Sequence, residues 1–376
     1  MKIFFITAMS VYLFGFVYIA WRIVYGLNMP ASRASAVYFL FLILCVLSIL
    51  AFIVSGTKMP LVSVIVPIGY TSMGIWAIFI SFFILNDIIN LINFILHIKN
   101  FRLYSTYIAL FLAVITCLWS LINAAFILRV KNITINVPNL PVAELKIVLL
   151  SDLHINMATS PKTINRIFDK VEKIHPDMIF FLGDIVDKDI YKNNRFEKYG
   201  FEKLRAPRGI FAVTGNHEYY AGLDSFLKAF NKLGFRVLQN ENALIENLAN
   251  IAGINDIDYK NSNAVEKVFS AADKNYPVLF LSHRPESFDI AAAVGAEKGL
   301  NIIQFSGHTH AGQIPPIDIA REFFMKYNYG IYKIGEKAIM YITSGTRLWG
   351  PPMRLIVPSE IPVITLKQQM HGRLDA

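Results

Sequence analysis

Long apolar runs with almost no charged position fill the first third of the chain. Four stretches free of charged residues approach or exceed the ~20 residues that a helix needs to cross a bilayer, and they cover 3–21, 34–57, 60–85 and 103–128. The first run is too long and too aromatic for a secretory signal, and no small-residue cleavage site follows it. The pattern predicts an all-α membrane domain at 1–130 with four transmembrane helices, at about 3–24, 35–56, 62–85 and 104–128.

An amphipathic segment extends the third apolar run to residue 98. Its polar residues recur at helical spacing and are Asp87, Asn90, Asn93 and His97. Such a stripe either lies at the membrane interface or faces partner helices inside the bundle. Because Lys99 and Arg102 follow at once, the interfacial interpretation is preferred.

Beyond residue 130 the hydrophobic period changes, and short strands alternate with helices. Residues 131–144 read as a linker with one short strand, 145–366 as a globular domain, and 367–376 as a polar tail. The 3.6-residue period predicts helices at about 162–174 and 222–233. Apolar runs predict strands that begin at residues 145, 177, 210, 277 and 302, and several more strands over 331–365.

Five of the predicted strands end on residue types that bind metals, usually beside a glycine. These strand-end residues are Asp152, His154, Asp184, Asn216, His217, His283, His308 and His310. In an extended chain residues i and i+2 point to the same side, so Asp152 and His154 can face one ion while Leu153 enters the core. Ligands of α/β sheets gather outside the carboxyl ends of strands, so we expect one shared site.

Composition and charge sharpen the division into two parts. The 376 residues are 55% hydrophobic and 17% charged, yet residues 1–128 hold only six basic residues and one acidic residue. Both cysteines, Cys45 and Cys117, fall in predicted spans, which excludes a disulfide framework and a cysteine-based zinc site. The net charge of +9 is divided between both parts and does not indicate a nucleic-acid partner. Charges flanking the spans balance, and only Lys146 tips the globular domain towards the cytoplasm.

The strand-end residues offer carboxylate, imidazole and amide ligands without a thiolate. Such a set suits divalent Mn, Fe or Zn, and it is too large for one ion but sufficient for two. Two ions ~3.5–4 Å apart, sharing a carboxylate, form a centre that cleaves phosphoesters.

The order and spacing of these residues resemble those of the calcineurin-like metallophosphoesterases, over roughly residues 130–365. The resemblance is carried by Asp152-x-His154, Gly183-Asp184-x-x-Asp187, Gly215-Asn216-His217-Glu218, His283 and Gly307-His308-x-His310. The longer strings GNHEYY, GHTHAGQI and WGPPMRL look like the membrane-anchored bacterial branch of that family. The implied fold is α/β (α+β), a four-layer αββα sandwich with two mixed sheets, preceded here by the membrane domain.

The resemblance also implies a role for each residue. The implied ligands of the first ion are Asp152, His154 and His310, and those of the second are Asn216, His283 and His308. Asp184 would bridge the two ions. His217 would protonate the leaving oxygen or stabilise the phosphoryl charge, and Asp187 would orient a ligand or His217.

The sequence therefore predicts a multi-pass membrane enzyme of a bacterial inner membrane that attacks phosphorus with metal-bound hydroxide. The expected substrate is a phosphorylated small molecule or a lipid-linked phosphoester or pyrophosphate. One alternative is an enzyme like the UDP-2,3-diacylglucosamine pyrophosphatases of lipid A synthesis. An alternative of another class is a membrane receptor or transporter with a metal-binding domain. Metal identity, preferred ester and oligomeric state stay open.

A few further residues have weaker claims on function. Arg284, Arg347 and Arg354 are candidates for a substrate phosphate or head group, with a surface charge as the alternative for each. Tyr219 and Tyr220 are candidates for a pocket wall, and 188–205 for a short lid or a solvated helix.

Overall fold

The computed structural model describes residues 2–55, 57, 61–156, 158–187, 196–245, 247–314, 323 and 325–369. Contacts divide the chain into two units. The helical unit comprises Met1–Ile127, Gly312–Arg321 and Gly350–Val357, and the globular unit comprises Leu128–Ala311, Glu322–Trp349 and Pro358–Ala376.

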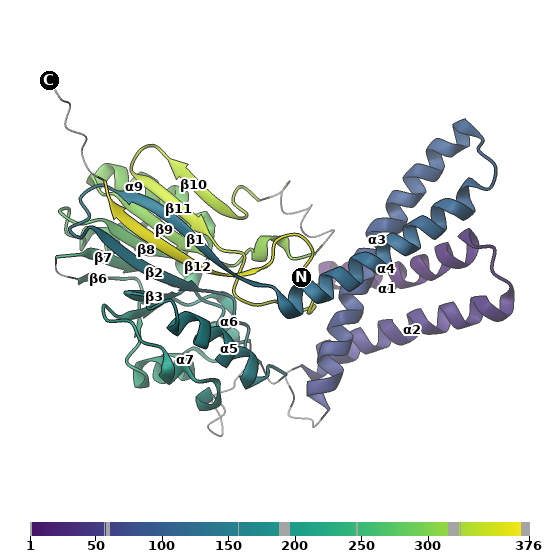
Figure 1. Cartoon of the computed structure of the whole chain (residues 1–376), viewed down its shortest axis with the longest axis horizontal. Helices are drawn as coiled ribbons and strands as arrows, with labels where there is room; N and C mark the ends of the chain where they lie inside the picture. The colour runs from purple at the N-terminus through teal and green to yellow at the C-terminus, as the bar shows by residue number, and fades with distance from the viewer. Residues whose placement is uncertain are drawn as a thin grey trace. The chain divides into compact units, whose positions relative to one another are not determined.

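Four long helices make up most of the helical unit (Figure 1). They are α1 (Lys2–Gly26), α2 (Ala31–Val54), α3 (Val62–Leu96) and α4 (Phe101–Phe126). All four are long and apolar enough to cross a membrane, as the apolar runs predict. The amphipathic segment is the continuation of α3 and is not a separate helix.

The polar stripe of α3 faces partner helices. Asp87 accepts a hydrogen bond from the Tyr18 hydroxyl at 2.6 Å and forms an ion pair with Arg22, both on α1. Asn90 donates to the Ser105 hydroxyl of α4 at 3.0 Å. The preferred interfacial interpretation is therefore wrong for Asp87 and Asn90. Inside an apolar bundle, side chains such as these gain more from hydrogen bonds across helices than from facing lipid.

Two short segments from late in the chain pack with these helices. Met353 is fully buried, and its sulfur lies where a side chain on Gly74 of α3 would stand. The Trp119 indole of α4 donates to the Leu355 carbonyl at 3.2 Å. The late segments also pair with each other, since the Leu355 amide donates to the Gln313 carbonyl at 2.9 Å.

Two six-stranded mixed sheets form the globular unit. The first has the strand order β1-β12-β2-β3-β4-β5, and the second has the order β10-β11-β9-β8-β7-β6. The first sheet contains β1 (Leu128–Val137), β2 (Glu144–Leu150), β3 (Met178–Phe181), β4 (Ile210–Ala212), β5 (Arg236–Val237) and β12 (Ser359–Gln368). The second contains β6 (Glu241–Ile245), β7 (Ala249–Gly253), β8 (Val278–Leu281), β9 (Ile302–Ser306), β10 (Gly330–Ile334) and β11 (Ala338–Ile342).

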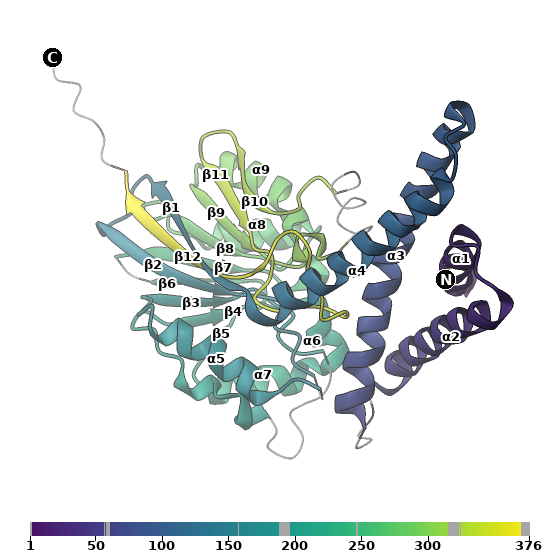
Figure 2. The ribbon, with the colours of Figure 1, turned by 45° about the vertical axis from the view of Figure 1, so that its right-hand side comes forward.

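Helices cover the outer face of each sheet, as Figure 2 shows for the globular unit. The longer helices are α5 (Pro161–Glu172), α7 (Leu223–Lys232), α8 (Ser262–Ser270) and α9 (Phe288–Lys298). The short helix α6 (Asn216–Ala221) precedes α7, and single 3-10 turns include η2 (Phe196–Tyr199), η3 (Phe201–Lys203) and η4 (Asp256–Asp258). Helices α5 and α7 share a core with the first sheet, and α8 and α9 share one with the second. The predicted four-layer αββα sandwich is confirmed.

The second half of strand β2, residues 147–150, is apolar without a break. Val148 and Leu150 point into the core under α5, whereas Ile147 and Leu149 point into the core between the two sheets. Both faces are therefore buried, which gives a continuous apolar run instead of an alternating one. Strands β2, β3 and β4 run parallel, as do β7, β8 and β9. Their carboxyl ends supply the loops that carry the predicted metal-binding residues.

Candidate metal centre

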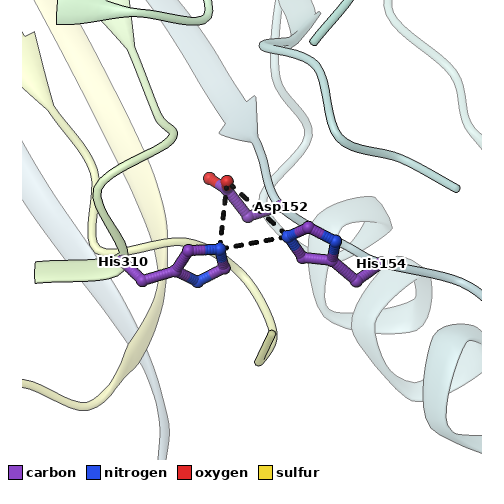
Figure 3. Close-up of side chains that lie close together, drawn as sticks. All are labelled: Asp152, His154 and His310. Carbon is purple, nitrogen blue, oxygen red and sulfur yellow. Dashed lines mark hydrogen bonds and ion pairs between the residues drawn. The ribbon is translucent and has the colours of Figure 1, made fainter. Parts of the chain in front are cut away.

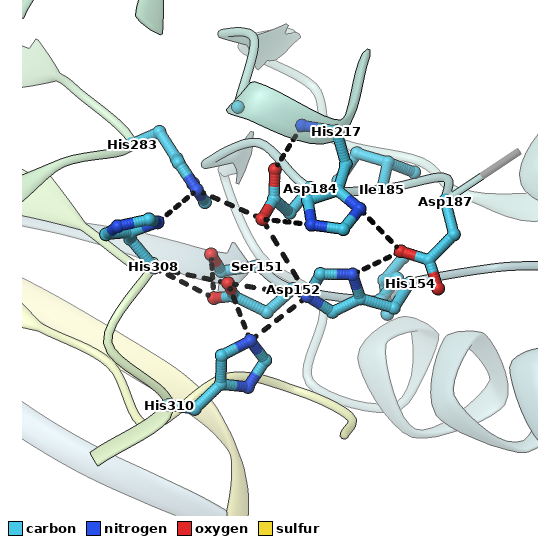
Figure 4. Close-up of polar contacts among 12 residues, drawn as sticks. Ser151, Asp152, His154, Asp184, Ile185, Asp187, His217, His283, His308 and His310 are labelled. Carbon is cyan, nitrogen blue, oxygen red and sulfur yellow. Dashed lines mark hydrogen bonds and ion pairs between the residues drawn. The ribbon is translucent and has the colours of Figure 1, made fainter. Parts of the chain in front are cut away.

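The loops after β2, β3, β4, β8 and β9 bring the predicted residues together (Figure 4). Seven of the eight strand-end residues fall into three overlapping groups, in each of which the ligand atoms lie within 4.8 Å of one another. The eighth, Asn216, begins α6 and directly precedes His217. The structure thus brings the side chains of these seven residues together at one place.

The first group joins Asp152, His154 and His310, whose polar atoms converge (Figure 3). The Nε2 atoms of His154 and His310 lie 3.0 Å apart. The Asp152 Oδ1 atom is 3.4 Å from the Nε2 of His310 and 4.0 Å from that of His154. Asp152 and His154 are almost completely buried, so only a partner with charge or hydrogen bonds can satisfy them there.

A second group joins Asp184, His283 and His308. The His283 Nε2 atom lies 3.2 Å from Asp184 Oδ2 and 3.2 Å from His308 Nδ1. On its other side Asp184 Oδ2 is 3.8 Å from the Nε2 of His154, a member of the first group. Asp184 thus stands between the two groups, where a bridging carboxylate would have to be.

His217 stands beside both groups and is held by Asp187. Its Nδ1 lies 2.9 Å from Asp187 Oδ1, and its Nε2 lies 4.0 Å from Asp184 Oδ2. The same Asp187 oxygen is 2.5 Å from the Nδ1 of His154. One carboxylate oxygen therefore fixes the ring orientation of both histidines, and the Nε2 atoms of both rings point towards Asp184.

Left-handed backbone, and not strand alternation, turns the ligand side chains inwards. Strand β2 ends at Leu150, and Asp152 (φ 56°) and His154 (φ 43°) follow it in the left-handed region. The expectation that they project from an extended chain is wrong, although Leu153 does enter the core. Asp184, His308 and His310 also have positive φ. Strain of this kind, of order 1–3 kcal/mol per residue, persists where the surroundings fix it and is typical of functional sites.

Close backbone approach explains the glycine that precedes each histidine block. A side chain on Gly307 would collide with the Ser151 hydroxyl, and its Cβ would lie 2.6 Å from Asp152 Oδ2. A Cβ on Gly215 would collide with the carboxylate of Asp184. Glycine is thus required because the loops pass directly against the carboxylates.

Glu218 is a residue of the site that the sequence analysis left without a role. It is fully buried, and its carboxylate accepts four backbone N–H groups. The backbone N–H groups of Ile185 and Val186 donate to Oε1 at 2.7 and 3.2 Å. Those of Gly215 and Asp184 donate to Oε2 at 2.7 and 2.9 Å. The sequence contains the signal for this role, because a glutamate three residues after a helix N-cap is the pattern of a capping box.

The charges of the site shift the pKa values of its members. Burial lowers the pKa of His154, but the charge and hydrogen bond of Asp187 outweigh it and raise the value to about 9. Burial also lowers the pKa of His283, but the charges of Asp184 and Asp152 outweigh it and raise the value to about 10. Against the effect of its own burial, the neighbouring imidazoles hold the pKa of Asp184 well below its usual range. Carboxylates and imidazoles here stabilise one another as charged pairs.

The donor set fits divalent ions. Two imidazole pairs and two imidazole–carboxylate pairs approach to 3.0–3.4 Å through the atoms that ligate metals. Among the described residues, the buried Asn216 Oδ1 has no hydrogen-bond partner, as expected of an amide oxygen reserved for an ion. Oxygen and nitrogen ligands without sulfur suit a divalent metal ion.

Two of the three candidate arginines, Arg347 and Arg354, contact backbone carbonyls. Arg347 donates from Nη1 to the Leu153 carbonyl at 2.6 Å, so it holds backbone between two predicted ligands. Arg354 is fully buried in the helical unit, with Nη1 on the Val357 carbonyl, which disfavours a substrate contact. Tyr220 is 74% exposed and meets the His217 ring edge-on at 5.6 Å. Of the suggested lid, residues 188–195 lie outside the described residues, and 196–203 form the turns η2 and η3.

Comparison with known proteins identifies the family of this chain. The model of the calcineurin-like phosphoesterase family matches residues 145–312. An uncharacterized metallophosphoesterase of Aquifex aeolicus is 32% identical over 274 residues, which cover 69% of this chain and 98% of that protein. The chain belongs to the calcineurin-like metallophosphoesterase family, and it is a metal-dependent phosphoesterase.

Relatives with membrane segments are also found. A protein of Danio rerio described as a transmembrane protein with a metallophosphoesterase domain is 27% identical over 80% of this chain and 73% of its own length. The chain spans 60% of the length of an uncharacterized metallophosphoesterase of Helicobacter pylori, at 32% identity. With its four apolar helices, the present chain is a membrane protein of the same family.

Among solved structures, the NAD nucleotidase of Haemophilus influenzae aligns with a TM-score of 0.33 and 14% identity, over 55% of this chain and 46% of that one. The 5′-nucleotidase precursor of Thermus thermophilus gives a TM-score of 0.34 and 14% identity, over 60% and 54%.

Proposed function

We propose that the protein hydrolyses a phosphoester or pyrophosphate bond of a lipid-linked substrate at two divalent ions, Mn, Fe or Zn. The ligands of the first ion are proposed to be Asp152, His154 and His310, and those of the second Asn216, His283 and His308. When bound, such a pair supplies an acidified water as nucleophile and neutralises the phosphoryl oxygens.

The position of Asp184 is the observation that carries the two-ion proposal. Its Oδ2 atom stands 3.2 Å from the His283 nitrogen and 3.8 Å from the His154 nitrogen, each from a different group. A carboxylate between two sets of imidazoles suits a shared ligand. A single-ion site would not need the second pair of imidazoles, His283 and His308, beside the same carboxylate.

His217 is proposed to protonate the leaving oxygen. Its side chain is 18% exposed, so substrate can reach it, and Asp187 holds its Nδ1 at 2.9 Å. With Nδ1 engaged in this way, the proton that can be transferred is on Nε2, the atom that faces the site. Its backbone N–H donates to Asp184 Oδ1 at 2.9 Å, which sets the ring beside the bridging carboxylate.

The membrane helices support a substrate that is itself anchored in the bilayer. Helix α4 ends at Phe126 and strand β1 begins at Leu128, so the chain passes from an apolar helix into the catalytic sheet with one residue between them. This short connection anchors the catalytic sheet to the membrane. A lipid-linked substrate is concentrated at the membrane, whereas a soluble substrate is not. We also propose that the globular unit faces the cytoplasm of a bacterial inner membrane, which a carboxyl-terminal topology reporter would test.

The full-length protein, purified in detergent and loaded with Mn²⁺, should hydrolyse a member of a panel of phosphate monoesters, diesters and pyrophosphates. The panel includes phospholipids and UDP-2,3-diacylglucosamine. Asp184→Asn and His217→Ala should each lower kcat by about 10²-fold or more, since each removes a group acting on the reacting atoms.

The matched control is His175→Ala, which removes an exposed imidazole that is not among the predicted ligands. It should leave kcat unchanged. If Asp184→Asn hydrolysed the substrate at the wild-type rate, the proposed role of Asp184 would be wrong. A metal content near one ion per chain, measured by mass spectrometry on an active sample, would contradict the two-ion proposal.

A further inference from the structure

Arg284 directly follows the predicted ligand His283 and has no part in the chemistry above. Its guanidinium is held at three places. Nε donates to Asp256 Oδ1 at 2.8 Å, Nη1 lies 3.1 Å from His308 Nε2, and the Cζ atom lies 4.8 Å from the centre of the Tyr259 ring. Asp256 is 4% exposed and therefore a firm anchor, whereas the Arg284 side chain is 21% exposed. An arginine is thus fixed at the edge of the site with part of its surface open.

The contact with His308 conflicts with metal loading. The His308 Nδ1 faces His283 Nε2 at 3.2 Å, so Nδ1 is the nitrogen that converges on the second group. When Nδ1 binds an ion, the neutral ring carries its proton on Nε2. That N–H then faces the N–H of Arg284, and two donors form no hydrogen bond. In the loaded protein Nη1 of Arg284 needs another acceptor, while Asp256 still holds Nε.

The chemistry of that acceptor follows from the guanidinium. Its two Nη groups form a planar fork that matches two oxygens of a phosphoryl group. Among the described residues, the carboxylate of Asp256 is engaged at Nε, and no carboxylate is seen at either Nη atom. The ring of Tyr259 limits how far the fork can turn. The acceptor that fits is an anionic group of the substrate.

The place of Arg284 identifies which group of the substrate it meets. It lies beyond the His308 ring, on the side opposite the nitrogen that converges on His283 and Asp184. Oxygens of the phosphorus under attack lie at the converging nitrogens. A group that reaches Arg284 is therefore the next one along the substrate.

We propose that Arg284, aligned by Asp256 and Tyr259, binds a second phosphoryl group that adjoins the scissile one. The substrate class is then a diphosphate, in which two phosphoryl groups are joined by a P–O–P link. This inference rests on the proposed phosphoester hydrolysis and narrows its substrate. Arg284 is a specificity-determining residue in this scheme. Water adds to the phosphorus at the predicted ligands, the P–O–P bond breaks, and the second phosphate leaves as its oxygen takes a proton from His217.

A pair of non-hydrolysable ligands tests the proposal on the full-length, Mn²⁺-loaded protein. Dimethyl methylenediphosphonate presents two adjoining phosphoryl groups, and methyl methylphosphonate presents one. Arg284→Ala should weaken binding of the diphosphonate by about tenfold or more, which is the usual loss for a charge-assisted bidentate contact. Binding of the monophosphonate should change by less than about twofold. Arg284→Lys should fall between, because it keeps the charge and loses the fork.

The control Arg236→Ala removes a half-exposed arginine that pairs with Glu241, and it should affect neither ligand. Metal content is measured on every variant. Should Arg284→Ala lose metal, the same comparison is made with Tyr259→Leu, which keeps the guanidinium and removes the ring that aligns it.

Equal weakening for both ligands, or none for the diphosphonate, overturns the proposal, as does a wild-type protein that binds both ligands equally. These outcomes leave the proposed hydrolysis intact if the protein cleaves phosphate monoesters. A wild-type protein that holds its ions and cleaves no phosphoester refutes the proposed function itself.

Discussion

The Asp187 carboxylate accepts the Nδ1–H of His217 at 2.9 Å, and this contact sets the direction in which His217 presents its other nitrogen. Asp187 also lies 2.5 Å from the Nδ1 of His154, so one oxygen orients a proposed proton donor and a proposed ligand. The two proposed functions of the site, metal binding and proton transfer, therefore depend on the same carboxylate.

Asp187→Asn is expected to lower kcat by about 10–100-fold, the usual effect of removing an orienting carboxylate behind a metal ligand. An amide cannot match the charge that favours both imidazoles. The measurement is steady-state kinetics together with metal content. Asp169→Asn, an exposed carboxylate on α5 that lies 3.8 Å from Lys203, is the control and should behave as wild type. Wild-type kcat with full metal content in Asp187→Asn would contradict the orienting role.

Glu218→Gln should destabilise the globular unit. The amide nitrogen of glutamine would face two of the four backbone N–H donors that now point at the carboxylate. Losing two charge-assisted hydrogen bonds costs about 3 kcal/mol or more of unfolding free energy. Chemical denaturation followed by circular dichroism measures this. Glu297→Gln, an exposed glutamate of α9, should leave the midpoint unchanged. An equal midpoint for both variants would show that the buried carboxylate is dispensable.

Gly307→Ala should weaken metal binding at the first group. Its methyl group would collide with the Ser151 hydroxyl and press on Asp152 Oδ2. Because the loop and the carboxylate must separate, we expect about tenfold weaker Mn²⁺ binding by titration calorimetry. Gly234→Ala is the control: it adds a methyl group at a positive φ but into open space. The prediction fails if both variants bind Mn²⁺ with wild-type affinity.

Metal binding should release protons. Without ions, the pKa values of His154 and His283 are raised to about 9 and about 10 by their carboxylate neighbours. Both rings therefore hold protons at pH 7.5, and an ion must displace them. Apparent Mn²⁺ affinity should rise as the pH rises from 6.5 and level off above the higher pKa. Calorimetry in two buffers of different ionisation enthalpy gives the number of protons, which we expect to be about two. A value of zero would mean that these rings are neutral before binding.

The sequence was most informative where one physical rule acts alone. Charge-free runs of bilayer length predicted α1 to α4, because a helix of that length satisfies all its backbone hydrogen bonds within itself in lipid. The ligand types at strand ends predicted a shared site, because the carboxyl ends of parallel strands meet at one edge.

Prediction failed where tertiary context decides. The strand pattern could not show that Asp152 and His154 turn by left-handed backbone, because β2 stops two residues earlier. The polar stripe of α3 fits an interface or a helix contact equally well until Arg22 of α1 is known to face Asp87. Strands β5 to β7 and helices α6, α8 and α9 were not predicted individually. The three strands and α6 are short, and the apolar positions of α9 follow no helical period.

The ligands proposed for each ion come from both sheets of the sandwich. Asp152, His154 and Asn216 follow strands of the first sheet, whereas His283, His308 and His310 follow strands of the second. On the proposed assignment each ion would be a cross-link between the sheets. Removing the ions with a chelator would then do more than stop catalysis. It would also remove the cross-links between the two sheets at this edge. Proteases would then cut the metal-free enzyme there before its core had unfolded.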